Sequence, residues 1–262
     1  MKKKKIIKIL FFSCLYIALP AEGRSQEWLM RVHNADVFAE MPALSCFHHS
    51  FASAHFRNDF GTKEMMYAEV YGMLSIGKNR VLASVNHYGY TNYGNMELGI
   101  GYGRDFGERF SMSARVFYMM AHARGYPPHH SLCTDFAFAC KVSPKLWLDA
   151  AVYNPFMLHY GVVGQEVIPL RFSLGGTWLP IRKLLLSVTI SKLLPGAWEV
   201  NGRFMTQPIA PLLLAVDGSN SHIGLFVGLI YKEFLFSVRA SWYYRISVSP
   251  EIGGWWFDAP KQ

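Results

Sequence analysis

Seven charged residues stand at alternate positions inside otherwise apolar stretches, and they are the first candidates for chemistry in this sequence. If each stretch is a strand with one face toward lipid, the seven side chains must point inward, because a charge facing hydrocarbon is costly. Such a set forms either a selectivity ring or head-group site for a ligand, or a network of ion pairs that fills and rigidifies an interior. We favour the ion-pair network because acids and bases are mixed. The seven residues are Glu69, Glu97, Arg115, Asp135, Asp149, Arg171 and Arg239.

The histidines and cysteines give no metal or disulfide signature. Histidines are adjacent at positions 48–49 and 129–130, and neighbours on a strand point to opposite faces, which makes each pair a poor metal site. We expect these histidines in exposed loops and predict no metal. Cys46, Cys133 and Cys140 show no CxxC spacing, and the last two face opposite sides if they share a strand. We expect them to be small buried hydrophobic residues.

Catalytic and nucleotide-binding patterns are also missing. Ser84 and His87 differ by three positions, so on a strand they face opposite sides and cannot act together. No Gly-x-Ser-x-Gly elbow occurs. The spaced glycines from Gly99 to Gly103 lie in an alternating stretch with no helix after it, so they relieve crowding from a neighbouring side chain or plug. We predict a protein that is not an enzyme and needs no cofactor.

The N-terminus has the form of an export signal. Lys2 to Lys5 form a positive region, and Ile6 to Ala18 form an apolar core too short to span a bilayer as a helix. Cleavage after Gly23 or Ser25 fits equally well, and a lipoprotein anchor at Cys14 is the less favoured alternative. We assign 1–25 to a signal peptide.

The basic balance of the chain comes mostly from this signal. Positions 1–25 hold six of the 26 Lys and Arg residues and one of the 18 acids, so the rest of the chain has a formal net charge of only +3. The sequence pI of about 9.3 is therefore no argument for nucleic-acid binding, and no basic stripe with interleaved aromatics remains.

The composition of the rest predicts a membrane barrel. Hydrophobic residues make up 51% and aromatics 15%, yet the mean hydropathy is only +0.13. A barrel produces this combination because alternate strand residues face lipid and a polar lumen. An aromatic-rich soluble β-sandwich is the alternative.

Alternation of apolar and polar residues recurs in stretches of about ten residues. In the stretch from Phe110 to Met119, for example, Met112, Ala114 and Val116 fall on one face. Read this way, the chain is all-β: a transmembrane up-and-down β-barrel of fourteen antiparallel strands. The strands are expected at 47–57, 65–76, 81–90, 95–105, 110–122, 132–142, 146–154, 168–178, 184–192, 197–206, 209–216, 222–231, 234–246 and 250–257, with the pair at 197–216 interrupted by prolines.

The connections alternate in length, which supports the same fold. Short turns are expected at 77–80, 106–109, 143–145, 180–183, 207–208 and 232–233, and longer loops at 58–64, 123–131, 155–167 and 217–221. Short turns on the periplasmic side and longer loops outside are typical of outer-membrane barrels. Aromatic clusters at strand ends favour an interfacial girdle, made of Tyr88, Tyr90, Trp178, Trp242, Tyr243, Trp255 and Trp256.

The segment before the first strand lacks alternation. We divide the exported chain into a periplasmic leader and hatch at 26–46 and an outer-membrane barrel at 47–262. The region near 33–46 is interpreted as a short helical plug inside the barrel or as a simple leader, with Met41, Pro42, Ala43 and Leu44 as the hatch residues.

These features resemble a known group of barrels. Met41-Pro-Ala-Leu44 is similar to the Asn-Pro-Ala motif before the first strand of FadL-like barrels, with Met in place of Asn. Phe60-Gly-Thr-Lys-Glu-Met65, Gly101-Tyr-Gly-Arg-Asp-Phe-Gly107 and Ser249-Pro-Glu-Ile252 resemble the related PorV/PorQ-type barrels. The likeness covers nearly all of the exported chain in order, and it implies fourteen strands with an N-terminal plug.

Two functions follow from the resemblance. Members of the group either pass small hydrophobic molecules or dock proteins in type IX secretion. We expect an outer-membrane protein of a Gram-negative cell that contacts outer-membrane lipid and passes a small hydrophobic ligand through a largely plugged lumen. The alternative is a non-conducting subunit that docks secreted or envelope proteins. Nucleic acid is not an expected partner.

Overall fold

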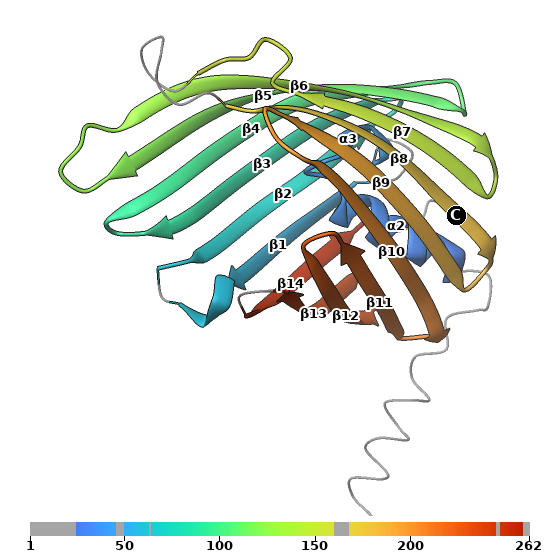
Figure 1. The fold of residues 1–262 in the computed structure, drawn as a ribbon. Coiled ribbons are helices and arrows are strands. Elements are labelled where there is room, and N and C mark those ends of the chain that lie inside the picture. The colour runs from blue at the N-terminus through green and yellow to red at the C-terminus, as the bar shows by residue number, and fades with distance from the viewer. Residues whose placement is uncertain (1–24, 46–49, 63, 160–167, 245–246, 259–262) are drawn as a thin grey trace, which may run out of the picture.

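The computed structural model describes residues 25–45, 50–62, 64–159, 168–244 and 247–258. Each strand pairs antiparallel with the next, and β1 pairs with β14 to close a fourteen-stranded barrel (Figure 1). This confirms the predicted fold class. The strands are β1 (Phe51–Asn58), β2 (Met66–Ile76), β3 (Asn79–Tyr90), β4 (Tyr93–Phe106), β5 (Phe110–Ala123), β6 (His129–Ser143), β7 (Leu146–Tyr153), β8 (Leu170–Ile181), β9 (Leu184–Leu194), β10 (Trp198–Ile209), β11 (Leu212–Ser219), β12 (His222–Tyr231), β13 (Phe234–Tyr243) and β14 (Val248–Phe257).

In the described part of the chain, two helices precede the first strand and lie within the ring of strands (Figure 1). They are α2 (Ser25–Asp36) and α3 (Pro42–Ser45), and together with the linker between them we call them the plug. A single turn of 3-10 helix, η2 (Asp59–Gly61), follows β1. The sequence prediction placed the plug near 33–46 and therefore missed most of α2. Trp28 to Ala35 are all buried, and the polar residues Arg31, His33 and Asn34 are buried with them, so the usual match between polar residues and the solvent side of a helix does not hold here.

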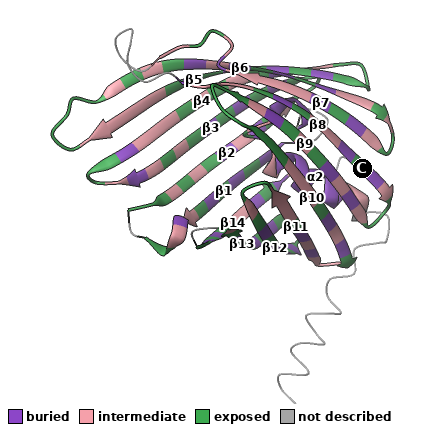
Figure 2. Ribbon diagram, in the orientation of Figure 1, coloured by how far each residue is buried: buried purple, intermediate pink, exposed green. Residues whose placement is uncertain are grey.

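The predicted alternation is present along the strands (Figure 2). In β5 the burial alternates residue by residue from Phe110 to Tyr118. The outward side chains are large and apolar, and Ile100 and Leu174 leave 66% and 65% of their surface exposed. The inward side chains pack on the plug or line the lumen. The sheet therefore separates an apolar outer wall from a mixed interior.

One end of the barrel has tight turns throughout, and we call it the short-turn end. β1 begins there and β14 ends there, since Phe51 pairs with Phe257. The prediction of a turn at 207–208 is wrong. β10 continues to Ile209 through a register shift after Thr206, because a bulge accommodates Pro208 in a strand.

The opposite end carries fewer long loops than predicted. The expected loop at 217–221 is wrong, because β11 runs to Ser219 and β12 begins at His222. Ser219 Oγ accepts hydrogen bonds from the backbone N–H groups of Ser221 and His222, at 3.0 and 3.1 Å. These bonds stabilise a tight turn between the two strands. The histidines at 129–130 likewise lie in β6 and not in a loop.

Some predictions fall on residues outside the described ranges. These are the signal peptide up to residue 24, Cys46 and the histidines at 48–49. Of the described cysteines, Cys133 is buried and Cys140 is half-buried, and both are free thiols. The expectation of a buried cysteine is thus confirmed for Cys133.

Candidate functional site

The apolar side chains of the plug pack on the inner wall at the short-turn end of the barrel. Trp28 meets Phe257 edge to face, with ring centroids 5.5 Å apart, and Phe38 stacks on Tyr71 at 5.2 Å. Leu29 is fully buried in the same cluster. Burial of each such side chain contributes about 1.5–3 kcal/mol. We call this cluster of plug and wall residues the apolar seat.

Arg115 on β5 ties the linker of the plug to the barrel wall. Its Nη1 donates to the carbonyl oxygen of Phe38 at 3.2 Å, and its Nη2 donates to that of Ala39 at 2.7 Å. The guanidinium also forms a buried ion pair with Asp135 on β6. A Cβ at Gly101 would collide with the Arg115 side chain, so glycine there lets the arginine lie against the wall, as the sequence analysis predicted for this stretch.

Asp36, the last residue of α2, is the centre of a second polar contact. Its Oδ2 lies 2.5 Å from Nη2 of Arg239 on β13 and also pairs with Arg203 on β10. Asp217 on β11 pairs with Arg203, and Glu251 on β14 lies 3.6 Å from Arg239. Burial alone would raise the pKa of Asp36, but the two guanidinium groups outweigh it and hold that pKa well below its ordinary value. The plug is therefore held by charge as well as by apolar packing.

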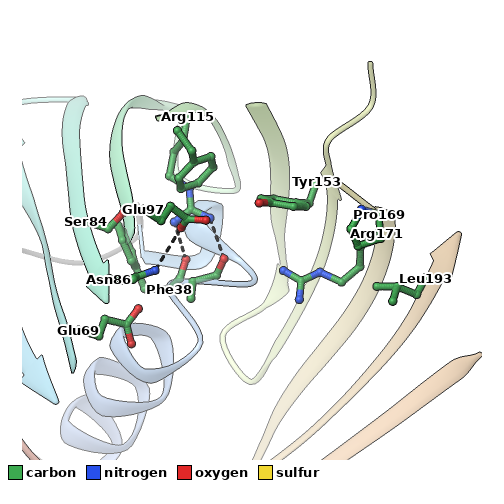
Figure 3. A pocket seen from close by; sticks show the side chains of 12 residues that line it. Phe38, Glu69, Ser84, Asn86, Glu97, Arg115, Tyr153, Pro169, Arg171 and Leu193 are labelled. Carbon is green, nitrogen blue, oxygen red and sulfur yellow. Dashed lines mark hydrogen bonds between the residues drawn. The ribbon is translucent and has the colours of Figure 1, made fainter. Parts of the chain in front are cut away.

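A cavity of about 270 Å³ lies between the linker of the plug and the wall (Figure 3). Its lining combines apolar side chains with charges: Phe38, Phe117, Tyr153 and Leu193 on the one hand, and Glu69, Glu97, Arg115 and Arg171 on the other. Asn86 Nδ2 donates to the Glu97 carboxylate at 3.1 Å. The guanidinium of Arg171 points into this space in Figure 3. We call this space the linker cavity.

Arg171 is the least neutralised cation of the linker cavity. Its Nη1 is 3.9 Å from Oε1 of Glu40, which is a long ion pair with both side chains partly exposed. Its guanidinium also lies over the ring of Tyr153, 5.5 Å from the centroid. Arg115, in contrast, is fully engaged with Asp135 and two carbonyl groups. A ligand with a negative or strongly polar end would find its available donors at Arg171.

A second cavity of about 360 Å³ adjoins the other side of the linker. Ala39 and Glu69 line both cavities. The second cavity is dominated by charged and hydroxyl-bearing side chains, among them those of the Asp36 contact. It is suited to water and polar groups, whereas the linker cavity offers an apolar surface for a ring or short chain.

His55 belongs to the wall of the second cavity. Its Nδ1 is 3.2 Å from Oε1 of Glu251, and its ring stacks on Tyr71 with centroids 5.5 Å apart. Trp255 covers it at 4.4 Å between centroids. This contact joins the first and last strands at the closure of the barrel.

Five of the seven predicted charged residues come together around the linker. Glu69, Glu97, Arg115 and Arg171 line the linker cavity, and Asp135 pairs with Arg115. Their side chains belong to strands β2 to β8, so neighbouring strands deliver them to one region.

The other two predicted residues lie elsewhere. Arg239 belongs to the Asp36 contact. Asp149 is buried apart from both groups, and a Cβ at Gly175 would collide with its carboxylate. Gly175 thus provides the space that Asp149 occupies.

The predicted hatch residues are all inside the barrel. Met41, Ala43 and Leu44 are buried in the apolar seat, and Pro42 begins α3. The carbonyl oxygen of Ala43 accepts a hydrogen bond of 2.6 Å from the Ser111 hydroxyl on β5. The position where FadL-like barrels have Asn therefore holds an apolar side chain packed in an apolar site.

The predicted aromatic girdle is wrong for the residues that face the interior of the barrel. Trp178, Trp242 and Trp256 are exposed on the outer wall, but Trp255 is only 1% exposed and lies inside. Tyr243 lines the second cavity.

The physical reason is the strand geometry, because adjacent residues point to opposite faces and Trp242–Tyr243 and Trp255–Trp256 cannot both face outward. By the same alternation Tyr88 shares the inner face of Ser84 and Asn86 in β3, and Tyr90 is half-buried beside the positive-φ Gly89.

Several residues of the site were not predicted from the sequence. Arg203, Asp217 and Glu251 also stand at alternate polar positions in strands, so the alternation signal was present for them. Asp36 gave no such signal, because its role depends on where α2 enters the lumen. His55 fell within the predicted strand at 47–57 and was given no role.

Neither a metal site nor a spanning helix is found in the described residues. No three side chains of His, Cys, Asp or Glu in these ranges gather closely enough to hold a metal ion. No helix in the described part of the chain is long and apolar enough to cross a membrane.

Comparison with known proteins finds similarity of fold only. No protein-family model matches the sequence, and no curated protein matches it. The solved structure of the P. putida toluene transporter TodX is similar with a TM-score of 0.66 at 8% identity, covering 87% of this chain and 95% of that chain. CymD, a monoaromatic hydrocarbon channel, gives a TM-score of 0.63 at 8% identity, covering 87% and 94%. The chain thus shares the barrel architecture of these channels.

Proposed function

We propose that this chain is an outer-membrane channel for a small, mostly apolar compound with one polar end. The observation that carries the proposal is the linker cavity, which lies inside a closed barrel between the plug and the wall. It combines aromatic and aliphatic surface with one weakly neutralised cation, Arg171. That combination fits a ligand with an apolar body and a polar terminus.

Placement in a membrane is supported by the outer wall. The strands close on themselves, so the ring leaves no unpaired edge, as hydrocarbon requires. Outward residues such as Val70, Leu74 and Ile100 expose more than half of their surface in each case. A band of this kind on a soluble protein would be an aggregation hazard, whereas lipid covers it without cost.

The size of the linker cavity limits the ligand. An apolar cavity of about 150 Å³ accommodates one benzene ring, so a space of about 270 Å³ accommodates a ring with a small substituent. The similarity in fold to channels named for toluene and monoaromatic hydrocarbons is consistent with this size, and it supports the proposal at the level of architecture only.

Passage requires the plug to move. The linker residues Phe38 and Ala39 form one side of the linker cavity, and the apolar seat closes the lumen beneath them. Arg115 holds the linker and Arg239 holds the end of α2 through Asp36. Displacement of the linker would join the two cavities, since Ala39 separates them.

Flux into proteoliposomes tests the proposal. The probe is benzenesulfonate, a one-ring anion that does not cross lipid unaided, and the comparison is glucose, a polar molecule of similar size. Benzenesulfonate should enter faster than glucose and faster than into empty liposomes. Arg171→Gln should lower its rate about tenfold, the factor for about 1.5 kcal/mol from a charged hydrogen bond.

Arg182→Gln is the matched control, because Arg182 lies in the exposed turn between β8 and β9 and should leave the rate unchanged. Equal entry of glucose and benzenesulfonate, or entry no faster than into empty liposomes, would contradict the proposal. A docking role in secretion and the assignment to PorV/PorQ-type barrels remain predictions from the sequence, with no specific observation in their favour.

A further inference from the structure

The outer wall carries an apolar groove that the proposed transport does not use. It lies over β4 to β8, the strands at the upper side of Figure 1, and has a volume of about 770 Å³. Two small outward residues, Ala114 and Ala150, lie in its lining among Phe136, Phe138 and Phe172. The hollow exists because the side chains of Ala114 and Ala150 are small, and the aromatic rings border it.

The groove has a direction, which follows from the strand register. Cross-strand partners form one continuous row through Arg104, Met112, Phe138, Ala150 and Leu174. Arg104 lies two residues from the end of β4 at Phe106, whereas Leu174 lies seven residues from the end of β8 at Ile181. Both strands end at the short-turn end, so the groove rises from that end toward the middle of the wall.

The rise of the groove along the barrel axis is close to the thickness of one membrane leaflet. Five strands with four spacings of about 4.8 Å give a row of about 19 Å. With strands tilted by about 40–45°, such a row climbs about 13 Å along the barrel axis. Half of a hydrocarbon core of about 30 Å is about 15 Å.

The end of the groove nearest the short turns is basic. Arg104 is exposed on the outer wall, and among the described residues no acidic group lies within ion-pair distance of it. Its guanidinium lies over the ring of Phe106, 5.9 Å from the centroid. The neighbouring Tyr102 hydroxyl donates to Asn79 Oδ1 at 2.5 Å, so the polar groups of this region gather toward the short-turn end.

The short turns add to this charge. They contain six basic residues and two acids, Glu108 and Glu233. The basic residues are Lys78, Arg109, Lys145, Arg182, Lys183 and Lys232. A rim of this composition attracts the phosphate groups of a lipid surface.

We propose that the groove binds a glycerophospholipid of the leaflet at the short-turn end. The phosphate lies at Arg104, and one acyl chain follows the row from Met112 to Leu174. A purely apolar occupant would leave the charge of Arg104 without a counterpart, and a free phosphate would leave the groove empty. The inference rests only on the membrane placement given above and not on transport, so flux and lipid binding fail independently.

Native mass spectrometry of the purified barrel in micelles tests this site. The probe is phosphatidylglycerol, compared with diacylglycerol of the same acyl chains and with inorganic phosphate. We expect a one-to-one complex with phosphatidylglycerol only. Arg104→Gln should weaken it about fivefold, which corresponds to about 1 kcal/mol, and Ala114→Phe should weaken it at least as much by filling the groove.

Two control variants make the same chemical changes elsewhere. Arg124→Gln removes an exposed charge from the loop between β5 and β6, at the opposite end of the barrel, and Ala83→Phe adds a ring to an exposed outer position on β3. Both should retain the complex, and gel mobility before and after heating checks that every variant is folded. Equal binding of diacylglycerol, retention by both groove variants, or equal loss in the controls would each overturn the proposal.

Discussion

Replacement of Asp36 by Asn should release the end of α2 while leaving its apolar seat intact. The carboxylate of Asp36 pairs with Arg203 and Arg239 in a buried position. The amide keeps the shape of the side chain but removes the negative charge. Asp217 and Glu251 remain beside the two guanidinium groups and partly neutralise them.

The magnitude follows from these contacts. Removal of one partner from a buried ion pair costs about 3–5 kcal/mol. Because Asp217 and Glu251 stay in place, we take the lower end, about 3 kcal/mol. Each 1.4 kcal/mol is a factor of ten, so local opening of α2 should become roughly a hundredfold more frequent.

Amide hydrogen exchange of the folded barrel in micelles measures this opening. Peptides covering residues 25–36 should lose about two decades of protection in Asp36→Asn, while strand peptides stay unchanged. Glu40→Gln is the control on the same segment. Glu40 is 42% exposed at its side chain and 3.9 Å from Arg171, and such an exposed pair contributes about 0–1 kcal/mol.

Two results would refute the reasoning. Unchanged protection of α2 would mean that the apolar seat alone holds the plug. A loss of protection shared by the strands would mean that Asp36 stabilises the whole barrel and is not a latch of the plug.

Three further variants test the interior and the wall, each by urea titration of folding into liposomes. Arg115→Ala should destabilise the barrel by about 3–5 kcal/mol, because Asp135 would remain as an uncompensated buried charge; a cost under about 1 kcal/mol would contradict this. Gly175→Ala should cost about 1–3 kcal/mol through collision with Asp149, and Asp149→Ala in the same chain should recover part of it; no recovery would mean another cause. Ile100→Arg should cost about 2–4 kcal/mol if this residue faces lipid, and a neutral result would argue against membrane placement.

The number of strands and the side of the sheet to which each side chain points were predictable, because both depend on a short-range property. Side chains on a strand alternate between two faces, so residues such as Glu97 and Arg115 could be assigned to the interior from their apolar neighbours alone. The same rule, applied to adjacent pairs, would have placed Trp255 inside when Trp256 faces out. The turn error at 207–208 came from reading Pro208 as a break, although a bulge admits it.

The partners of the charged residues were not predictable in the same way. Arg115 meets Asp135 because the register of β5 and β6 sets them opposite each other. Asp36 meets Arg203 and Arg239 only because α2 lies in the lumen. The polar residues Arg31, His33 and Asn34 of that helix are buried, so the sequence does not show that the helix lies inside the barrel.

The sequence by itself determined that the chain forms fourteen alternating strands with an apolar outer face and a charged interior, because alternation is a property of neighbouring residues. Only the tertiary structure decided which charges meet, where the plug lies and where cavities and grooves remain. Closure of the ring brings His55 to Glu251, 196 positions apart. Contacts of this kind depend on register and on the shape of the whole barrel, which no short stretch of residues contains.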